Sequence, residues 1–180
     1  MLSYCLVSLL SSLPASAQHD FTPAHLDTAL VYLGAQEIGM NDGPEVAVFL
    51  ASVGLSPGFA WCAAYVSFCL EAARVTLPVV RSARAQDFIT HDSIEAQYAA
   101  HYRVNPAMGS LVVWKKGNGP FGHVGIVIYW YGRCGVTVEG NTSSGQFGNQ
   151  RDGDGVWVRT RCIEAGNAFR ITHFTPVHQK

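Results

Sequence analysis

The chain has 180 residues, enough for one domain with a hydrophobic core of ordinary size. Hydrophobic residues make up 48% of it and charged residues 14%, which is typical of a compact folded protein and not of a disordered one. Twelve basic and thirteen acidic residues give a net charge of −1. This balance gives no electrostatic reason to expect binding to nucleic acid or to an anionic membrane surface.

The first seventeen residues, MLSYCLVSLLSSLPASA, differ in character from the rest. Residues 6–13 form an apolar run too short to span a bilayer, and Ala-Ser-Ala at 15–17 is a small-x-small site of the kind that signal peptidase cuts. No lysine or arginine precedes the run, which departs from the usual pattern. We expect residues 1–17 to be a signal peptide, with an ordinary N-terminal helix as the alternative, and residues 18–180 to form a single domain.

The next part of the chain has the periodicity of amphipathic helices. In the first of them Pro23 suits the opening turn. An apolar stripe there would consist of Leu26, Leu30 and Leu33. In the second helix Pro44 occupies the first turn. The predicted helices cover residues 22–36, 41–54 and 58–75, with a weaker one at 82–91.

After residue 106 the pattern changes to that of β-strands. The segments SLVVW, HVGIVIYWY, GVTVE, GVWVRTR and AFRITHF are rich in valine, isoleucine and aromatic residues and are separated by turns. Helices followed by strands predict an α+β domain with a mostly antiparallel sheet. The connection over residues 140–155 is long for a compact domain and is therefore a candidate functional loop.

The third predicted helix opens with GFAWC, which places Cys62 near its start. A free cysteine titrates near pH 8.5, and the unpaired N–H groups and dipole of a helix N-terminus stabilise its thiolate. The same N–H groups can stabilise the oxyanion of a tetrahedral intermediate. The alternative is a packing role, because free cysteine is among the most buried residue types.

His123 and Glu139 supply what a nucleophilic thiol needs. His123 opens a strongly apolar strand, and Gly122 and Gly125 leave room beside its imidazole. Glu139 ends the next predicted strand, so a hairpin brings it to the same edge of the sheet, where its carboxylate can orient the imidazole. A surface histidine at a turn and a solvated glutamate are the alternatives, but with Cys62 the three form a nucleophile, base and orienter set.

The other cysteines have a structural interpretation. Cys69 lies two helical turns after Cys62, or ~10.5 Å along the axis, which is too far for a disulfide. If the strands that flank residues 140–155 pair directly, opposed residue numbers sum to about 295, and Cys134 and Cys162 become cross-strand neighbours. Export would supply the oxidising compartment for a disulfide between them. Two buried thiols, or a register shift that separates the pair, are the alternatives.

Metal sites are not expected. The chain has no CxxC or HxxxH spacing of the kind that binds zinc. RDGDG at residues 151–155 lacks the ligand spacing and closing glutamate of an EF-hand, so a hairpin turn is favoured over a calcium loop. We expect no metal and no cofactor.

Three segments resemble the signatures of the CHAP family, the cysteine- and histidine-dependent amidohydrolases and peptidases. They are WCAAYVSFCLEAA, GSLVVWKKGNGPFGHVGIVIYW and VTVEGN, and the resemblance covers about residues 24–174. It implies a papain-like α+β fold with N-terminal helices packed on the sheet, and cleavage of amide bonds in bacterial peptidoglycan by an amidase or endopeptidase. By resemblance, Cys62 is the nucleophile, His123 the general base and acid, Glu139 the orienter and Asn141 a second polar partner.

We expect a thioester mechanism in a monomer that is secreted or periplasmic in a bacterium, with peptidoglycan as its partner, no nucleic acid and no membrane span. Two alternatives remain: a domain on the same fold that binds wall peptides without cutting them, and a thiol acyltransferase. The intact cysteine, histidine and glutamate favour an enzyme. Gly109-Ser110 stands where the family often has Gly-Asp, at the opening of a strand away from the chemistry.

Overall fold

A computed structural model of the chain describes residues 22–75, 81–144, 153–164 and 169–178. Its helices are α2 (Ala24–Val31), α3 (Pro44–Ser52), α4 (Cys62–Ala72) and α5 (Ala96–Tyr102), with a 3-10 helix, η1 (Ala85–Phe88). Its strands are β1 (Ile94–Glu95), β2 (Leu111–Lys116), β3 (Gly122–Tyr131), β4 (Cys134–Thr142), β5 (Gly155–Cys162) and β6 (Phe169–Thr175). Among the described helices, none has the length and apolar character that crossing a bilayer requires.

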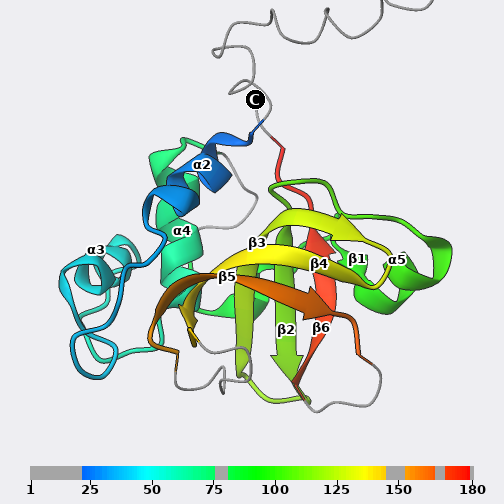
Figure 1. Cartoon of the computed structure of the whole chain (residues 1–180). Helices are drawn as coiled ribbons and strands as arrows, with labels where there is room; N and C mark the ends of the chain where they lie inside the picture. The colour runs from blue at the N-terminus through cyan, green and yellow to red at the C-terminus, as the bar shows by residue number, and fades with distance from the viewer. Residues whose placement is uncertain (1–21, 76–80, 145–152, 165–168, 179–180) are drawn as a thin grey trace, which may run out of the picture.

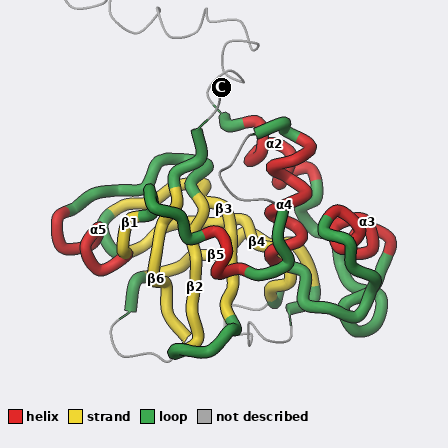
Figure 2. The backbone as a smooth tube through the Cα atoms, turned by 180° about the vertical axis from the view of Figure 1, so that it is seen from behind, coloured by secondary structure: helices red, strands yellow, loops and turns green. Residues whose placement is uncertain are grey.

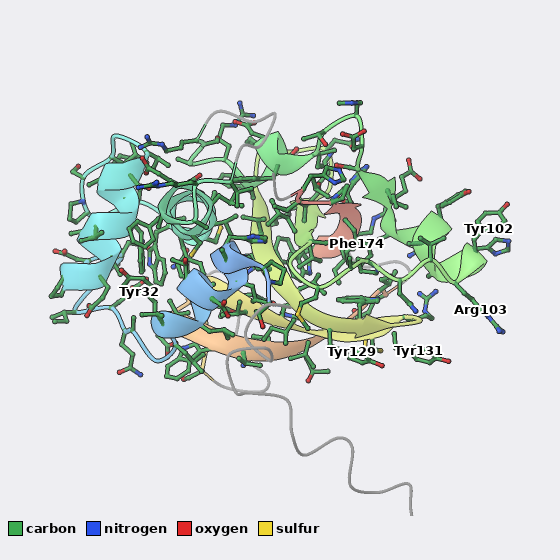
Figure 3. All side chains as sticks on the ribbon, turned by 90° about the horizontal axis from the view of Figure 1, so that it is seen from above. Tyr32, Tyr102, Arg103, Tyr129, Tyr131 and Phe174 are labelled. Atoms are coloured by element: carbon green, nitrogen blue, oxygen red, sulfur yellow. A yellow bond between two sulfur atoms is a disulfide. The ribbon has the colours of Figure 1, made fainter. Side chains whose placement is uncertain are left out.

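The strands form one sheet in the order β1-β6-β2-β3-β4-β5, and every neighbouring pair is antiparallel. The predicted α+β class with an antiparallel sheet is therefore confirmed. Figure 1 shows α2, α3 and α4 gathered at one side of the sheet. From behind, α5 and β1 lie beside β6 at the opposite end of the molecule from α3 (Figure 2). Tyr102 and Arg103 mark this far end, while Tyr129 and Tyr131 lie near the end of β3 (Figure 3).

The sheet separates two hydrophobic clusters, and β2 contributes to both because its side chains alternate. Leu111 and Val113 belong to the larger cluster, which also contains the buried faces of α2, α3 and α4. Val112 and Trp114 belong to the smaller cluster, which includes α5 and β6. With both faces covered, the middle of the sheet is a rigid support for side chains that carry chemistry.

The first helix is shorter than predicted. It ends at Val31 instead of residue 36, and Leu33 is 49% exposed, so the expected apolar stripe is only partly buried. The cause is tertiary: the Gly34 N–H donates to the Val156 carbonyl, and the Val156 N–H donates to the Ala35 carbonyl. These bonds draw the backbone out of the helix and onto β5.

Other local structure differs from the prediction in length or was not predicted. The weak, short helix expected within residues 82–91 is the four-residue η1, whereas α5 and β1 were not predicted. β1 has two residues and α5 has seven, so neither is long enough to show a clear period. The candidate loop at residues 140–155 lies partly outside the described residues, because 145–152 are not described.

Cys134 and Cys162 form a disulfide, as the register argument predicts. The two residues lie opposite each other across the β4–β5 pair, with a Cα–Cα distance of 4.1 Å. The register is constant from the Cys134–Cys162 pair to the Glu139–Trp157 pair, because the two residue numbers sum to 296 in each (134 + 162 and 139 + 157). Cys62 and Cys69 are free and buried.

We expect two free thiols in the denatured, unreduced protein that begins at Gln18, counted with a thiol reagent. Four would contradict the disulfide. The bond closes a segment with a sequence separation of 28, so Cys134→Ser with Cys162→Ser should lower the unfolding free energy by about 3.5 kcal/mol. Urea denaturation of both forms measures that difference, and Cys69→Ser serves as the control because it removes a thiol without removing a cross-link.

Candidate active site

Cys62 is the first residue of α4, where the sequence placed it. Eight of the eleven residues of this helix are buried, because it packs against α2, α3 and the sheet. Cys62 itself is 7% exposed. A cysteine at the first helical position lies among backbone N–H groups that have no partner within the helix.

Trp61 fixes the position at which α4 begins. Its indole stacks on Phe49, with ring centroids 5.6 Å apart. The indole N–H donates to Glu37 Oε1 at 2.6 Å, and the Trp61 backbone N–H donates to Asn141 Oδ1 at 3.3 Å. The residue before Cys62 is thus held by packing and by two hydrogen bonds from distant parts of the chain.

Asn141 belongs to this anchor and not to the histidine. Its Nδ2 donates to Glu37 Oε1 at 3.0 Å and to Asn41 Oδ1 at 3.2 Å, and no bond of its side chain within the described residues reaches His123. Asn141 has a φ of 54°, a left-handed conformation that asparagine tolerates better than most residues. The expected second polar partner thus lies on the nucleophile's side of the site, where it holds Trp61.

Gly140 lets α4 approach β4. A Cβ at this position would lie 2.7 Å from ring atoms of both Trp61 and Tyr65, so a larger residue would push the helix away. Glu139 does not end β4 as predicted, because the strand continues to Thr142 with an irregularity in between.

His123 is the second residue of β3 and is 3% exposed. Its Nε2 lies 3.0 Å from Glu139 Oε2, and its ring contacts Trp114 edge-on, with centroids 5.2 Å apart. The structure therefore brings His123 and Glu139 together as the hairpin argument predicts. His123 also hydrogen-bonds the Cys62 thiol. Because Nε2 is engaged by Glu139, Nδ1 is the ring nitrogen available to the sulfur.

The two glycines beside His123 have different roles from the one predicted. A Cβ on Gly125 would lie 2.6 Å from Glu139 Cγ, so this glycine makes room for the glutamate and not for the imidazole. A Cβ on Gly122 would lie 2.5 Å from the Trp114 carbonyl oxygen, so this glycine permits close pairing of β3 with β2.

Glu139 is fully buried and fully engaged. Oε1 accepts hydrogen bonds from Thr137 Oγ1 at 2.5 Å and from Arg161 Nε at 2.7 Å, and Oε2 accepts from Arg161 Nη2 at 2.5 Å in addition to its contact with His123. Sequence reasoning missed Arg161. The available signal was the register of the β4–β5 hairpin, which places Arg161 opposite Gly135. Residues 135 and 139 lie on the same face of β4, so Arg161 is on the face that carries Glu139.

Comparison with known proteins identifies the domain. Residues 54–141 match the family model described as the CHAP domain. The chain contains a CHAP domain. The matched segment includes Cys62, His123, Glu139 and Asn141, and it ends before β5. No curated protein and no solved structure matches the chain.

The electrostatics of this CHAP domain favour an ion pair between Cys62 and His123. Burial raises the pKa of the Cys62 thiol, but the charge of His123 and hydrogen bonds from His123, Val124 and Ala63 outweigh burial and lower the pKa below its ordinary value. Burial likewise lowers the pKa of His123, but Cys62 and Glu139 raise it to about 9. The opposite shifts of the two partners describe one event, the transfer of the thiol proton to the imidazole.

Glu139 stays ionised despite its burial. Burial raises the pKa of this carboxyl, while hydrogen bonds and charges from Arg161 and His123 hold the pKa far below its usual range. Cys69 shows the opposite case in the same helix: burial raises the pKa of its thiol well above the ordinary value. Cys69 is thus a packing residue, as expected.

Within the described ranges of the CHAP domain, no group of three or more histidine, cysteine, aspartate or glutamate side chains could hold a metal ion. Of the segment considered as a calcium loop, residues 151 and 152 lie outside the description. Asp154 accepts hydrogen bonds from the Ser144 backbone and hydroxyl and from the Trp157 indole at 2.7 to 3.0 Å. Its carboxylate therefore closes the base of the loop.

We expect Cys62 to react with iodoacetamide at a pH well below that of an ordinary cysteine, because only the thiolate is alkylated. The rate should fall as pH drops through the lowered pKa of Cys62. Mass spectrometry of the Cys62 peptide at each pH gives the profile. Cys69 is the internal control and should remain unmodified while the protein is folded. An apparent pKa at or above about 8.5 for Cys62 would contradict the ion pair.

Proposed function

We propose that this protein is a secreted bacterial cysteine hydrolase that cleaves amide bonds of peptidoglycan, as an amidase or an endopeptidase. The CHAP domain supports a hydrolase that acts on the cell wall. The observation that carries the proposal is that His123 contacts both Cys62, at the start of α4, and Glu139, on β4. A domain that only bound wall peptides would have no need of a thiol prepared for attack.

In the first half-reaction, the Cys62 thiolate adds to the amide carbonyl and the carbonyl oxygen becomes an oxyanion. The Trp61 N–H is already engaged by Asn141. The Cys62 N–H belongs to the first turn of α4, whose N–H groups have no partner within the helix, so we assign it to the oxyanion. As the C–N bond breaks, the His123 imidazolium gives its proton to the leaving amine. A thioester on Cys62 and a free amine result.

In the second half-reaction, neutral His123 takes a proton from water, and the resulting hydroxide adds to the thioester carbonyl. Breakage of the C–S bond releases a carboxylic acid and restores the thiolate beside an imidazolium. Glu139 stays ionised throughout, and it holds the ring in one orientation and stabilises its charged form.

We propose further that the catalytic domain spans residues 18–180 with a papain-like arrangement of helix-borne cysteine and sheet-borne histidine. Residues 1–17, which lie outside the described residues, are proposed as the signal peptide that directs export. The Cys134–Cys162 disulfide supports an oxidising location, because such bonds persist in secreted and periplasmic proteins.

Purified peptidoglycan incubated with the protein should yield new amine and carboxyl termini, which mass spectrometry identifies. Cys62→Ala should abolish this digestion, and His123→Ala should reduce it by at least ~10²-fold, because the thiolate and the proton donor are lost. Both variants should keep their circular dichroism. Undiminished digestion by either folded variant would contradict the mechanism. Co-sedimentation with intact wall but no digestion by the unmodified protein would indicate a binding domain.

Glu139→Gln should leave measurable digestion but less than the unmodified protein. The amide oxygen can still accept a hydrogen bond from His123, whereas the charge that stabilises the imidazolium is gone. The fall should therefore lie between no effect and that of His123→Ala. Full activity of Glu139→Gln would show that the Glu139 charge has no part in the mechanism. Glu71→Gln is the matched control, because it makes the same change at an exposed position of α4.

A further inference from the structure

The Glu139 carboxylate lies between two cations. His123 approaches Oε2 from β3 at 3.0 Å, and Arg161 from β5 bonds both oxygens, at 2.7 and 2.5 Å. A guanidinium with two parallel bonds to a carboxylate fixes its position and its plane. The atom that orients the imidazole is thus itself oriented by Arg161.

Arg161 is held in place by further contacts. Its Nη2 donates to Thr142 Oγ1 at 3.1 Å, and its guanidinium carbon lies 5.7 Å from the centre of the Trp114 ring. The same ring contacts the His123 imidazole. Arg161 therefore reaches the histidine by two routes, through the carboxylate and through the indole.

Four groups at this site carry charge in its thiolate form. The negative ones are the Cys62 thiolate and the Glu139 carboxylate, and the positive ones are the His123 imidazolium and the Arg161 guanidinium. Their sum is zero. Without Arg161 the sum is −1, and burial of a net charge is costly, so the site would take up a proton and lose its thiolate.

We propose that Arg161 is a positioning residue of this site, which holds Glu139 ionised against His123 and balances the buried charge when Cys62 is a thiolate. This role rests on the proposed hydrolase function for its biological meaning. It adds to the matched CHAP segment, because β5 lies beyond residue 141.

The other charged groups near the site do not substitute for Arg161. The charges that act on His123 are those of Cys62 and Glu139, and those that act on Glu139 are His123 and Arg161. Arg159 also lies on β5 and senses Glu139, Arg161 and Asp154 at longer range, but it bonds the Ser143 carbonyl at 2.8 Å. From β2, the contact with His123 is made by Trp114, which carries no charge.

The test is the iodoacetamide profile of Cys62 in Arg161→Gln. Loss of the balancing cation should raise the apparent pKa of the reacting thiol by about one to two units. Peptidoglycan hydrolysis should fall at neutral pH and recover partly as pH approaches the new value. Arg159→Gln is the matched control, because it removes a buried cation from the same strand without touching the carboxylate, and its profile should shift much less.

A double variant separates charge balance from a merely structural role. Glu139→Gln with Arg161→Gln again gives a neutral site in the thiolate form, so its profile should return toward that of the unmodified protein, whereas a structural role predicts no recovery. Arg161→Lys keeps the positive charge, so the apparent pKa of Cys62 should change little in this variant. If Arg161→Gln does not fold, as circular dichroism would show, Arg161→Lys and the double variant carry the test.

Three results would overturn the proposal. The apparent pKa of Cys62 could be unchanged in folded Arg161→Gln, or it could rise equally in Arg159→Gln and Arg161→Gln. It could also be as high in the Glu139→Gln/Arg161→Gln double variant as in Arg161→Gln alone. Alkylation needs no substrate, so the test is independent of hydrolysis. If Arg161→Gln raises the apparent pKa of Cys62 but the unmodified protein never digests peptidoglycan, the proposed function is contradicted and the role of Arg161 still stands.

Discussion

The ion pairs of the buried Glu139 carboxylate are the constraint on which the rest of the site depends. Removal of an ionised carboxylate from water costs several kcal/mol unless it is paired and hydrogen-bonded, and here four donated contacts from Thr137, His123 and Arg161 meet that cost. Each contact demands a feature of the sheet: the β3–β4 register, a glycine at position 125, and β5 alongside β4. The Glu139 carboxylate stabilises the imidazolium form of His123, and the charge of that imidazolium stabilises the Cys62 thiolate.

One short stretch of β4 joins the two halves of the active site. Glu139 faces His123, Gly140 admits the rings at the start of α4, and Asn141 binds the backbone of Trp61. Consecutive side chains of a strand point to opposite faces, so Glu139 and Gly140 serve different sides of the sheet. The left-handed Asn141 lies in the irregularity of β4 between Glu139 and Thr142. The nucleophile and its base are therefore placed by one rigid segment, and a change in the approach of α4 to β4 would alter their separation directly.

Much of this arrangement could be predicted from sequence, because the deciding signals are local. The hairpin of β3 and β4 is enough to bring His123 and Glu139 together, and the separate register of β4 with β5 pairs Cys134 with Cys162. The place of Cys62 at the start of a helix was also readable from the sequence. Arg161 was missed because its contact with Glu139 depends on a long side chain that reaches along the sheet from the Gly135 level. The end of α2 was missed for a related reason: the backbone pairing of residues 34–36 with β5 overrides helical propensity.

β5 is an edge strand, and such strands fray unless they are secured. Here both ends are secured. At its start, Gln36 bridges Gly155, and at its end the disulfide at Cys162 ties it to β4, with the Ile163 N–H bonded to the Arg133 carbonyl. Arg161 precedes the disulfide by one residue, so the cross-link holds in place the cation that keeps Glu139 charged. In this molecule the disulfide and the catalytic electrostatics are parts of one arrangement, although Cys134 and Cys162 lie outside the reacting groups.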